Sequence, residues 1–167
     1  MDDAVLRLAL EHGALLCAFM SIIIAGSLYQ DPMIWTHSAP PDLKQKLGPP
    51  GPATLRRKRV WAGLMMLGLV LVFGRLARAV LAWSPEVFPG VQLALAAYVT
   101  FQVFNLYDAL VMDVGLVVFK PRWAFVEGTA DMPGLRSVRW HVVNYVKGVV
   151  GGVPAAALVT GVAWLLR

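Results

Sequence analysis

The chain has 167 residues, of which 58% are hydrophobic and only 15% are charged, and its mean hydropathy is +0.64. Since ordinary soluble domains have about 45–50% apolar and about 25% charged residues, this composition excludes a typical water-soluble globule and indicates an all-α integral membrane protein. The net charge of +5 does not indicate a nucleic-acid partner, because the Lys and Arg residues flank hydrophobic segments and do not line one amphipathic face.

Four hydrophobic segments are long enough to cross the hydrocarbon core as helices, which takes about 20 residues at about 1.5 Å per residue. They cover residues 5–28, 60–83, 91–119 and 141–166. The third segment is longer than a span requires, so we expect it to be tilted or to protrude. The sequence therefore predicts a single transmembrane domain over 1–167, built as a four-helix bundle.

Two longer connections, 30–59 and 120–139, carry many Lys and Arg residues, whereas the short turn 84–90 carries none. Since loops rich in Lys and Arg stay on the cytoplasmic side, we expect both connections in the cytoplasm and both termini on the non-cytoplasmic side. The first connection contains several prolines, which favour irregular backbone over helix. The membrane that we expect is the bacterial inner (cytoplasmic) membrane.

The first long connection ends in four consecutive basic residues, Arg56, Arg57, Lys58 and Arg59. Basic residues beside a span attract anionic lipid headgroups, at about 1 kcal/mol per residue. We therefore predict anionic membrane lipids as the partner of this cluster, although simple anchoring of the span explains it equally well. A nucleic-acid role is disfavoured because the run has no interleaved aromatic residues.

Polar side chains recur along one side of the third segment, and they are the sharpest functional signal in the sequence. At helical steps of three and four, the recurring residues are Tyr98, Gln102, Asn105 and Asp108. Asp113 lies on the same broad side. An ionisable residue at the bilayer centre costs about 2.5–3.5 kcal/mol on insertion scales, so these side chains imply partners or a water-filled cavity.

Basic residues in the neighbouring segments are candidate partners for the two aspartates. By depth along the helices, Asp113 is expected to pair with Lys147, and Arg75 is expected to reach Asp108. Arg78 is expected to extend outward to the interface or to meet an acidic residue of the first segment. A buried network that fixes the helix register is the interpretation that we prefer, because full pairing is the default for charges in a membrane.

The competing interpretation is that Asn105, Asp108 and Asp113 line a path for a cation or a proton, because carboxylate and amide oxygens are ligands of hard cations. It would make the protein an oligomeric transporter or channel. Both interpretations place Asp108 in the bundle interior.

Further polar residues near the ends of the first and fourth segments are secondary candidates. Glu11 and His12 open the first segment, where we prefer an interfacial polar cap to a general-base pair or half of a metal site. His141 and Asn144 open the fourth segment as boundary groups or as part of a vestibule that faces the cytoplasm.

Gly148 and Gly152 follow on the fourth segment at small-xxx-small spacing. This spacing makes a groove in which a second helix can pack closely. A neighbouring helix of the same chain is the expected occupant, and contact with a second copy is left open.

The sequence contains no catalytic motif, and we expect no cofactor and no metal. The single cysteine, Cys17, excludes a disulfide or a Cys-x-x-Cys redox pair, and the three histidines lie too far apart in the predicted topology to sandwich a haem. We therefore expect a non-enzymatic membrane protein, either an accessory subunit or a bundle that binds a lipid or another lipophile. As an accessory or binding protein, the chain would assemble as a homo-oligomer or join a larger membrane complex.

Overall fold

The computed structural model describes residues 3–83 and 88–166 as an all-helical bundle. Its long helices are α1 (Asp3–Gln30), α3 (Pro52–Leu81), a composite third helix, and α6 (Val138–Leu165). The third helix consists of α4 (Gly90–Tyr107), a π-helical turn η2 (Asp108–Asp113) and α5 (Val114–Phe119). Each of the four is long and apolar enough to cross a membrane, which confirms the predicted number of candidate membrane-spanning helices.

Short helices occupy the two long connections. The first contains η1 (Thr36–Ser38) and α2 (Pro41–Leu47), and the second contains η3 (Arg122–Ala124) and η4 (Pro133–Arg136). The expectation of irregular backbone over 30–59 is therefore wrong in part.

Proline explains why helices form in the first connection. Pro41 and Pro52 occupy the first turns of α2 and α3, where a missing N–H costs nothing because that donor has no partner within the helix. Since α3 begins at Pro52, the four basic residues Arg56–Arg59 lie on its opening turns and not in a loop.

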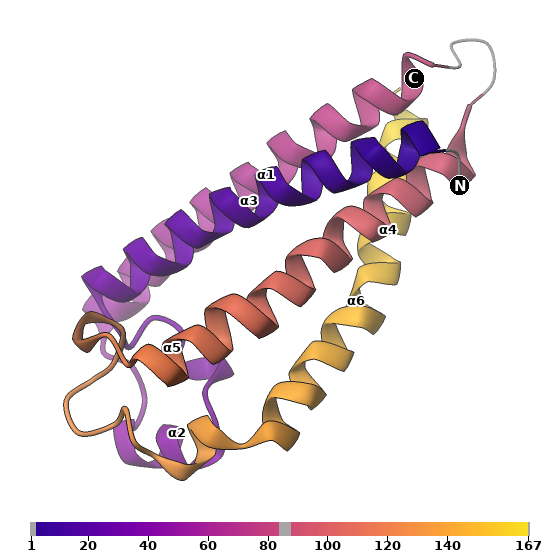
Figure 1. Ribbon diagram of the computed structural model, residues 1–167. Helices are drawn as coiled ribbons and strands as arrows, with labels where there is room; N and C mark the ends of the chain where they lie inside the picture. The colour runs from indigo at the N-terminus through magenta and orange to yellow at the C-terminus, as the bar shows by residue number, and fades with distance from the viewer. Residues whose placement is uncertain (1–2, 84–87, 167) are drawn as a thin grey trace.

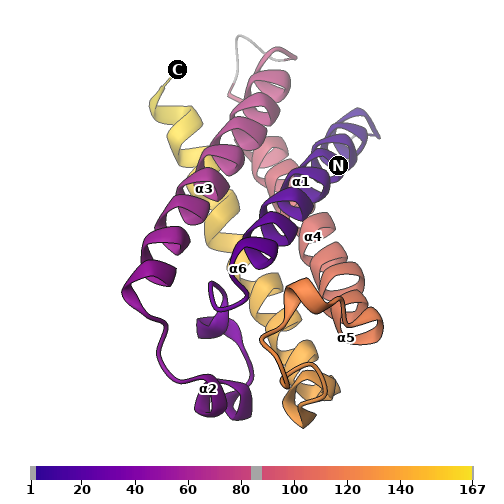
Figure 2. The same ribbon diagram turned by 90° about the vertical axis from the view of Figure 1, so that its left-hand side faces the viewer.

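The helices run antiparallel in sequence order, so the connections gather at two ends (Figures 1 and 2). The start of α1, the end of α3, the start of α4 and the end of α6 lie at one end, here called the terminal end. The opposite end, here called the loop end, holds α2 and both long connections. Helix α4 is central, because it packs against α1 on one side and α6 on the other.

A dense core fills the bundle toward the terminal end. It contains small residues that let the backbones approach closely, with Ala9, Ala96 and Ala97 almost fully buried. The Thr100 hydroxyl, also buried, donates to the Ala9 carbonyl at 3.1 Å and ties α4 to α1. Larger side chains such as Leu76 and Leu93 complete this core.

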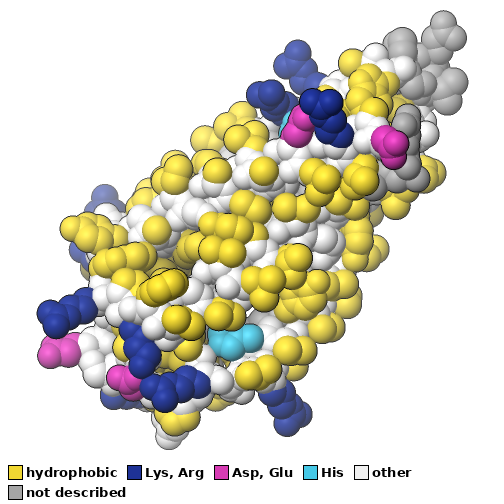
Figure 3. Space-filling model, in the orientation of Figure 1, with side chains coloured by type: hydrophobic (Ala, Val, Ile, Leu, Met, Phe, Trp, Pro, Cys, Tyr) yellow, Lys and Arg dark blue, Asp and Glu magenta, His cyan; other side chains and the backbone are white. Residues whose placement is uncertain are grey.

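The outer surface suits a lipid environment. Large hydrophobic side chains are exposed along α3 and α6, including Val70 at 64% and Leu158 at 68% of their area. Figure 3 shows hydrophobic side chains over the middle of one face, with most Lys and Arg side chains toward the two ends. A soluble monomer seldom exposes so continuous an apolar surface, whereas a membrane protein presents it to lipid.

Polar contacts at the loop end hold the two long connections together. The Asp42 carboxylate accepts a hydrogen bond from the Gly134 backbone N–H at 2.8 Å, and Lys46 donates to the Gly128 carbonyl at 2.7 Å. These contacts join segments more than 80 residues apart in sequence. They position α2 and η4 over the end of the bundle, where they form part of the wall of a cavity.

Candidate functional site: a cavity at the loop end

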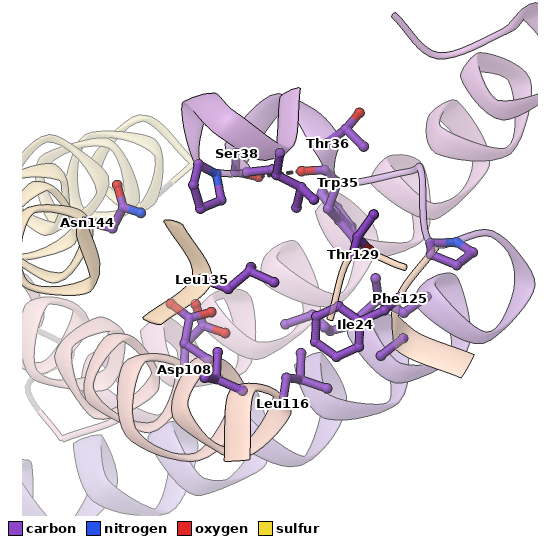
Figure 4. Close-up of a pocket in the computed structure, with 18 of the residues that line it drawn as sticks. Ile24, Trp35, Thr36, Ser38, Asp108, Leu116, Phe125, Thr129, Leu135 and Asn144 are labelled. Atoms are coloured by element: carbon purple, nitrogen blue, oxygen red, sulfur yellow. Dashed lines mark hydrogen bonds between the residues drawn. The ribbon is translucent and has the colours of Figure 1, made fainter. Parts of the chain in front are cut away.

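A cavity of about 440 Å³ lies at the loop end, between the ends of the long helices and the two connections. Most of its lining is apolar and comes from α1, α5 and both connections: Met20, Ile24, Leu28, Leu116, Val117, Phe125 and Leu135 are examples. Figure 4 shows Asp108 near Leu135, with Leu116, Ile24 and Phe125 farther along the cavity wall. The site is therefore a partly open, mainly apolar cavity with a few polar groups in its wall.

The π-helical turn brings two of these polar groups to the same cavity. Asp108 and Asp113 stand five residues apart, and in a regular α-helix they would point about 140° away from each other. A π-helix joins residues i and i+5 by its hydrogen bonds, so residues five apart become neighbours on one face. Both aspartates line the cavity as a result.

Asp113 has a partner in α6. Its Oδ2 atom lies 3.3 Å from Nδ1 of His141, which also lines the cavity. The other ring nitrogen of His141, Nε2, donates to the Leu135 carbonyl at 2.8 Å, because a carbonyl can only accept. The histidine thus connects the π-helical turn to the second long connection.

Asp108 and Asn144 line the same cavity without such a partner. Within residues 3–83 and 88–166, neither side chain makes a hydrogen bond or an ion pair with another protein group. Asn144 stands three residues after His141 and so shares its face of α6. The cavity wall therefore offers one carboxyl and one carboxamide that remain free to bind a ligand.

The part of the polar stripe nearer the terminal end has a different role, because it packs against α6. Asn105 donates to the Tyr145 carbonyl at 3.1 Å, and Gln102 donates to the Val149 carbonyl at 3.4 Å. Gly148 and Gly152 face these two side chains so closely that a Cβ atom at either glycine would overlap them. The two amides thus occupy the glycine groove of α6 and are used in helix packing.

The basic residues expected in the network lie elsewhere. Arg75, Arg78 and Lys147 are exposed, and in the part of the chain that the structure describes none of them forms an ion pair with Asp108 or Asp113. The predicted pairs of Asp113 with Lys147 and of Asp108 with Arg75 are therefore wrong.

Helix geometry explains both differences. Lys147 stands six residues after His141, about 120° away around α6, so only His141 faces Asp113. On α1, Phe19 packs on Gly68 of α3, and Ser21, two residues later, hydrogen-bonds to Tyr107, the neighbour of Asp108. Asp108 therefore lies at nearly the same height along the bundle axis as Gly68. Arg75 lies seven residues farther toward the terminal end, about 10 Å along the axis.

Glu11 and His12 are adjacent in sequence but point in different directions. Glu11 is exposed and pairs with Arg7 at 2.9 Å, so it does not meet Arg78. His12 is buried, with 5% of its area exposed. Its Nδ1 donates to the Leu8 carbonyl at 2.8 Å, and its Nε2 has no hydrogen-bond partner among the described residues. Across the described residues, no three His, Cys, Asp or Glu side chains come together as a metal site.

Four residues that the sequence pattern singled out, Asp108, Asp113, His141 and Asn144, line the cavity, but most of its wall was not predicted. Trp35, Phe125 and Leu135 belong to the two connections and carry no local signal that they meet above the bundle. No family model, curated protein or solved structure matches this chain. The chemistry of the residues that line the cavity is therefore the basis for inferring its ligand.

Proposed function

We propose that this protein is a membrane helix bundle that binds a lipid-like molecule in the cavity at its loop end, as an accessory or binding protein without catalytic activity. The observation that carries the proposal is the cavity itself. Its volume of about 440 Å³ falls in the range of roughly 300–1,000 Å³ of small-molecule sites, and its wall combines apolar side chains with a few convergent polar groups.

The position of the cavity also favours a lipophilic ligand. It lies at the loop end of four helices that are apolar enough to span a membrane, so lipophilic molecules at that edge of the bilayer are a nearby source. Aromatic side chains such as Trp35, Phe104 and Phe125 provide large contact areas for a hydrocarbon chain or ring.

Binding fits the described packing better than transport does. Between the cavity and the terminal end, α1 and α4 are joined by the almost fully buried Ala9, Ala96 and Thr100. A path through one copy of the bundle would have to open this contact. The Asn105 side chain, proposed for a cation path, is held in the packing against α6, because its NH2 group donates to Gln102 and to the Tyr145 carbonyl and its Oδ1 faces Gly148.

The orientation of the cavity rests on the charge distribution. The connections that surround it carry many of the Lys and Arg residues of the chain, so we place the loop end in the cytoplasm. The four basic residues Arg56–Arg59, on the first turns of α3, would then lie at the cytoplasmic interface, where anionic headgroups are the expected contact.

Photolabelling with a neutral lipophile tests the binding proposal. The protein would be placed in nanodiscs of zwitterionic lipid with dodecanol that carries a diazirine at the end of its chain, and the labelled peptides would be mapped by mass spectrometry. We expect the label on peptides that contain Ile24, Leu116 or Phe125.

Two tryptophan substitutions provide the matched pair for this experiment. Val117→Trp fills the cavity, whereas the neighbouring Val118 is 64% exposed and Val118→Trp points outward. The label should be lost in the first variant and kept in the second, with circular dichroism showing both folded. A label spread evenly over the lipid-facing helices, or one unaffected by Val117→Trp, would refute the proposal.

A further inference from the structure

The charge state of the cavity follows from its hydrogen bonds. Because Nε2 of His141 donates to the Leu135 carbonyl, a hydrogen bond between Nδ1 and Asp113 needs a second proton. Either His141 is an imidazolium beside a carboxylate, or Asp113 is a carboxylic acid that donates to a neutral ring. In both cases the pair as a whole has no net charge, so Asp113 is neutralised within the protein.

Asp108 receives no such compensation. Its carboxyl lines the cavity and has no protein partner in the described ranges, and Arg75 lies on the exposed face of α3. Asp108 is half-buried, and a carboxylate in a largely apolar wall is stabilised less than one in bulk water unless a cation or hydrogen-bond donors meet it. Either a proton or a cation carried by the ligand would relieve this cost, and a ligand cation would do so while the carboxyl stays ionised.

The rest of the cavity wall also favours a cationic ligand over an anionic one. No Lys or Arg is among the described residues that line it, although the two connections around it carry several. An anionic headgroup would therefore meet no Lys or Arg side chain among the described residues, and His141 in the wall is already paired with Asp113. Trp35, Trp140 and Phe125 add aromatic faces, which attract cations.

We propose that the ligand of this cavity is a lipophilic amine, whose protonated nitrogen binds the Asp108 carboxylate while its apolar part lies against Ile24, Leu116 and Phe125. The Asn144 carbonyl is within the same wall and offers a second acceptor to the ammonium group, which has three donors. This inference rests on the proposed function, since it specifies the chemical class of molecule that the cavity takes.

Three probes of equal chain length separate the head-group chemistries. Diazirine-tagged dodecylamine, dodecanol and dodecanoic acid would be compared at neutral pH in zwitterionic nanodiscs, by the yield of label on the cavity peptides at equal membrane content. A hydrogen bond to a charged group is worth enough that we expect the amine to exceed the alcohol roughly tenfold. The acid should label least.

Two carboxamide variants show whether Asp108 is responsible. Asp108→Asn should lower the ratio of amine to alcohol labelling to about one, whereas Asp131→Asn, an exposed carboxylate outside the cavity, should leave the ratio unchanged. Asp108→Glu keeps the charge and should keep the preference for the amine. If Asp108→Asn does not fold, the wild-type ratio of amine to alcohol labelling still tests the preference of the cavity for an amine.

The outcomes separate this inference from the proposed function. Equal labelling of the cavity by amine and alcohol in the wild type would overturn the amine assignment and leave lipophile binding intact. A preference for the acid would overturn it as well and would point to an anionic lipid. If none of the three probes labels the cavity peptides, the proposed function itself fails.

Discussion

The Asp42 carboxylate and the Gly134 backbone N–H, 92 residues apart in the chain, are joined by a hydrogen bond of 2.8 Å. This bond fastens α2 of the first connection to η4 of the second. Gly134 allows it, because a Cβ atom there would overlap the Asp42 carboxylate and lie 2.7 Å from Cβ of Pro40. The cavity at the loop end therefore depends on a close approach that requires glycine.

Gly134→Ala should separate the two connections. The added methyl group displaces Asp42, and overpacking of this kind costs about 1–3 kcal/mol. We expect a lower thermal midpoint in detergent and faster amide hydrogen exchange in residues 40–47 and 131–136. Gly51→Ala is the control, because Gly51 has an ordinary φ of −71° and nothing within 4 Å of an added Cβ. Equal stability of the two variants would contradict this role of Gly134.

Gly148→Ala should weaken the contact between α4 and α6, because the new Cβ would overlap the Asn105 amide. We expect a loss of about 1–3 kcal/mol, measured by unfolding in detergent. Gly151→Ala, three residues along the same helix with open space around it, should cost nothing and should gain up to about 1 kcal/mol from helix propensity.

A double-mutant cycle tests whether Asn105 is the group that Gly148 accommodates. Asn105→Ala removes the overlapping amide, so the effect of Gly148→Ala should be smaller in that background. Strict additivity of the two changes would show that the methyl group meets something else.

The pKa of Asp131 should lie below its ordinary value of 3.8. The main cause is a hydrogen bond from the Lys120 ammonium, and Arg136 at 2.8 Å adds to it. Since the folded-state pKa is depressed, the stabilisation from this carboxylate is present above about pH 3.8 and is lost as the pH falls through the folded-state pKa. An NMR titration of Asp131 would measure the shift.

Lys120→Gln should move the pKa of Asp131 back up, because it removes the first and largest cause of the shift. Arg122→Gln removes a charge of the same connection that, among the described residues, makes no ion pair with Asp131, and it should leave that pKa unchanged. A similar upward shift in both variants would mean that general charge, and not the specific contact, lowers the pKa.

Cysteine labelling tests the proposal that the loop end lies in the cytoplasm. Cys17 is the single cysteine and is buried, so Cys17→Ser gives a clean background. Gln45→Cys, on an exposed position of α2, should react with an impermeant maleimide only after the inner membrane is opened. Leu166→Cys, 82% exposed at the terminal end, should react in cells whose inner membrane is intact. The reverse pattern would invert the proposed topology.

The sequence by itself determined the four long helices, because about 20 apolar residues in succession have few structures available in a membrane other than a helix. It also identified the polar stripe of the third helix, since side chains three and four residues apart share a face in any α-helix. The glycine groove of α6 could be predicted for the same reason, because its spacing is a property of one helix.

The tertiary structure decided which polar groups meet. A π-helical turn changes the direction of Asp113 relative to Asp108, and regular helical spacing gives no sign of it. That turn, together with the rotation of α6, pairs Asp113 with His141 and leaves Lys147 exposed. The cavity likewise depends on contacts such as Asp42 with Gly134, which join distant parts of the chain and have no periodic pattern in the sequence. Local periodicity can fix a face of a helix, whereas partners and cavities arise from the packing of several elements at once.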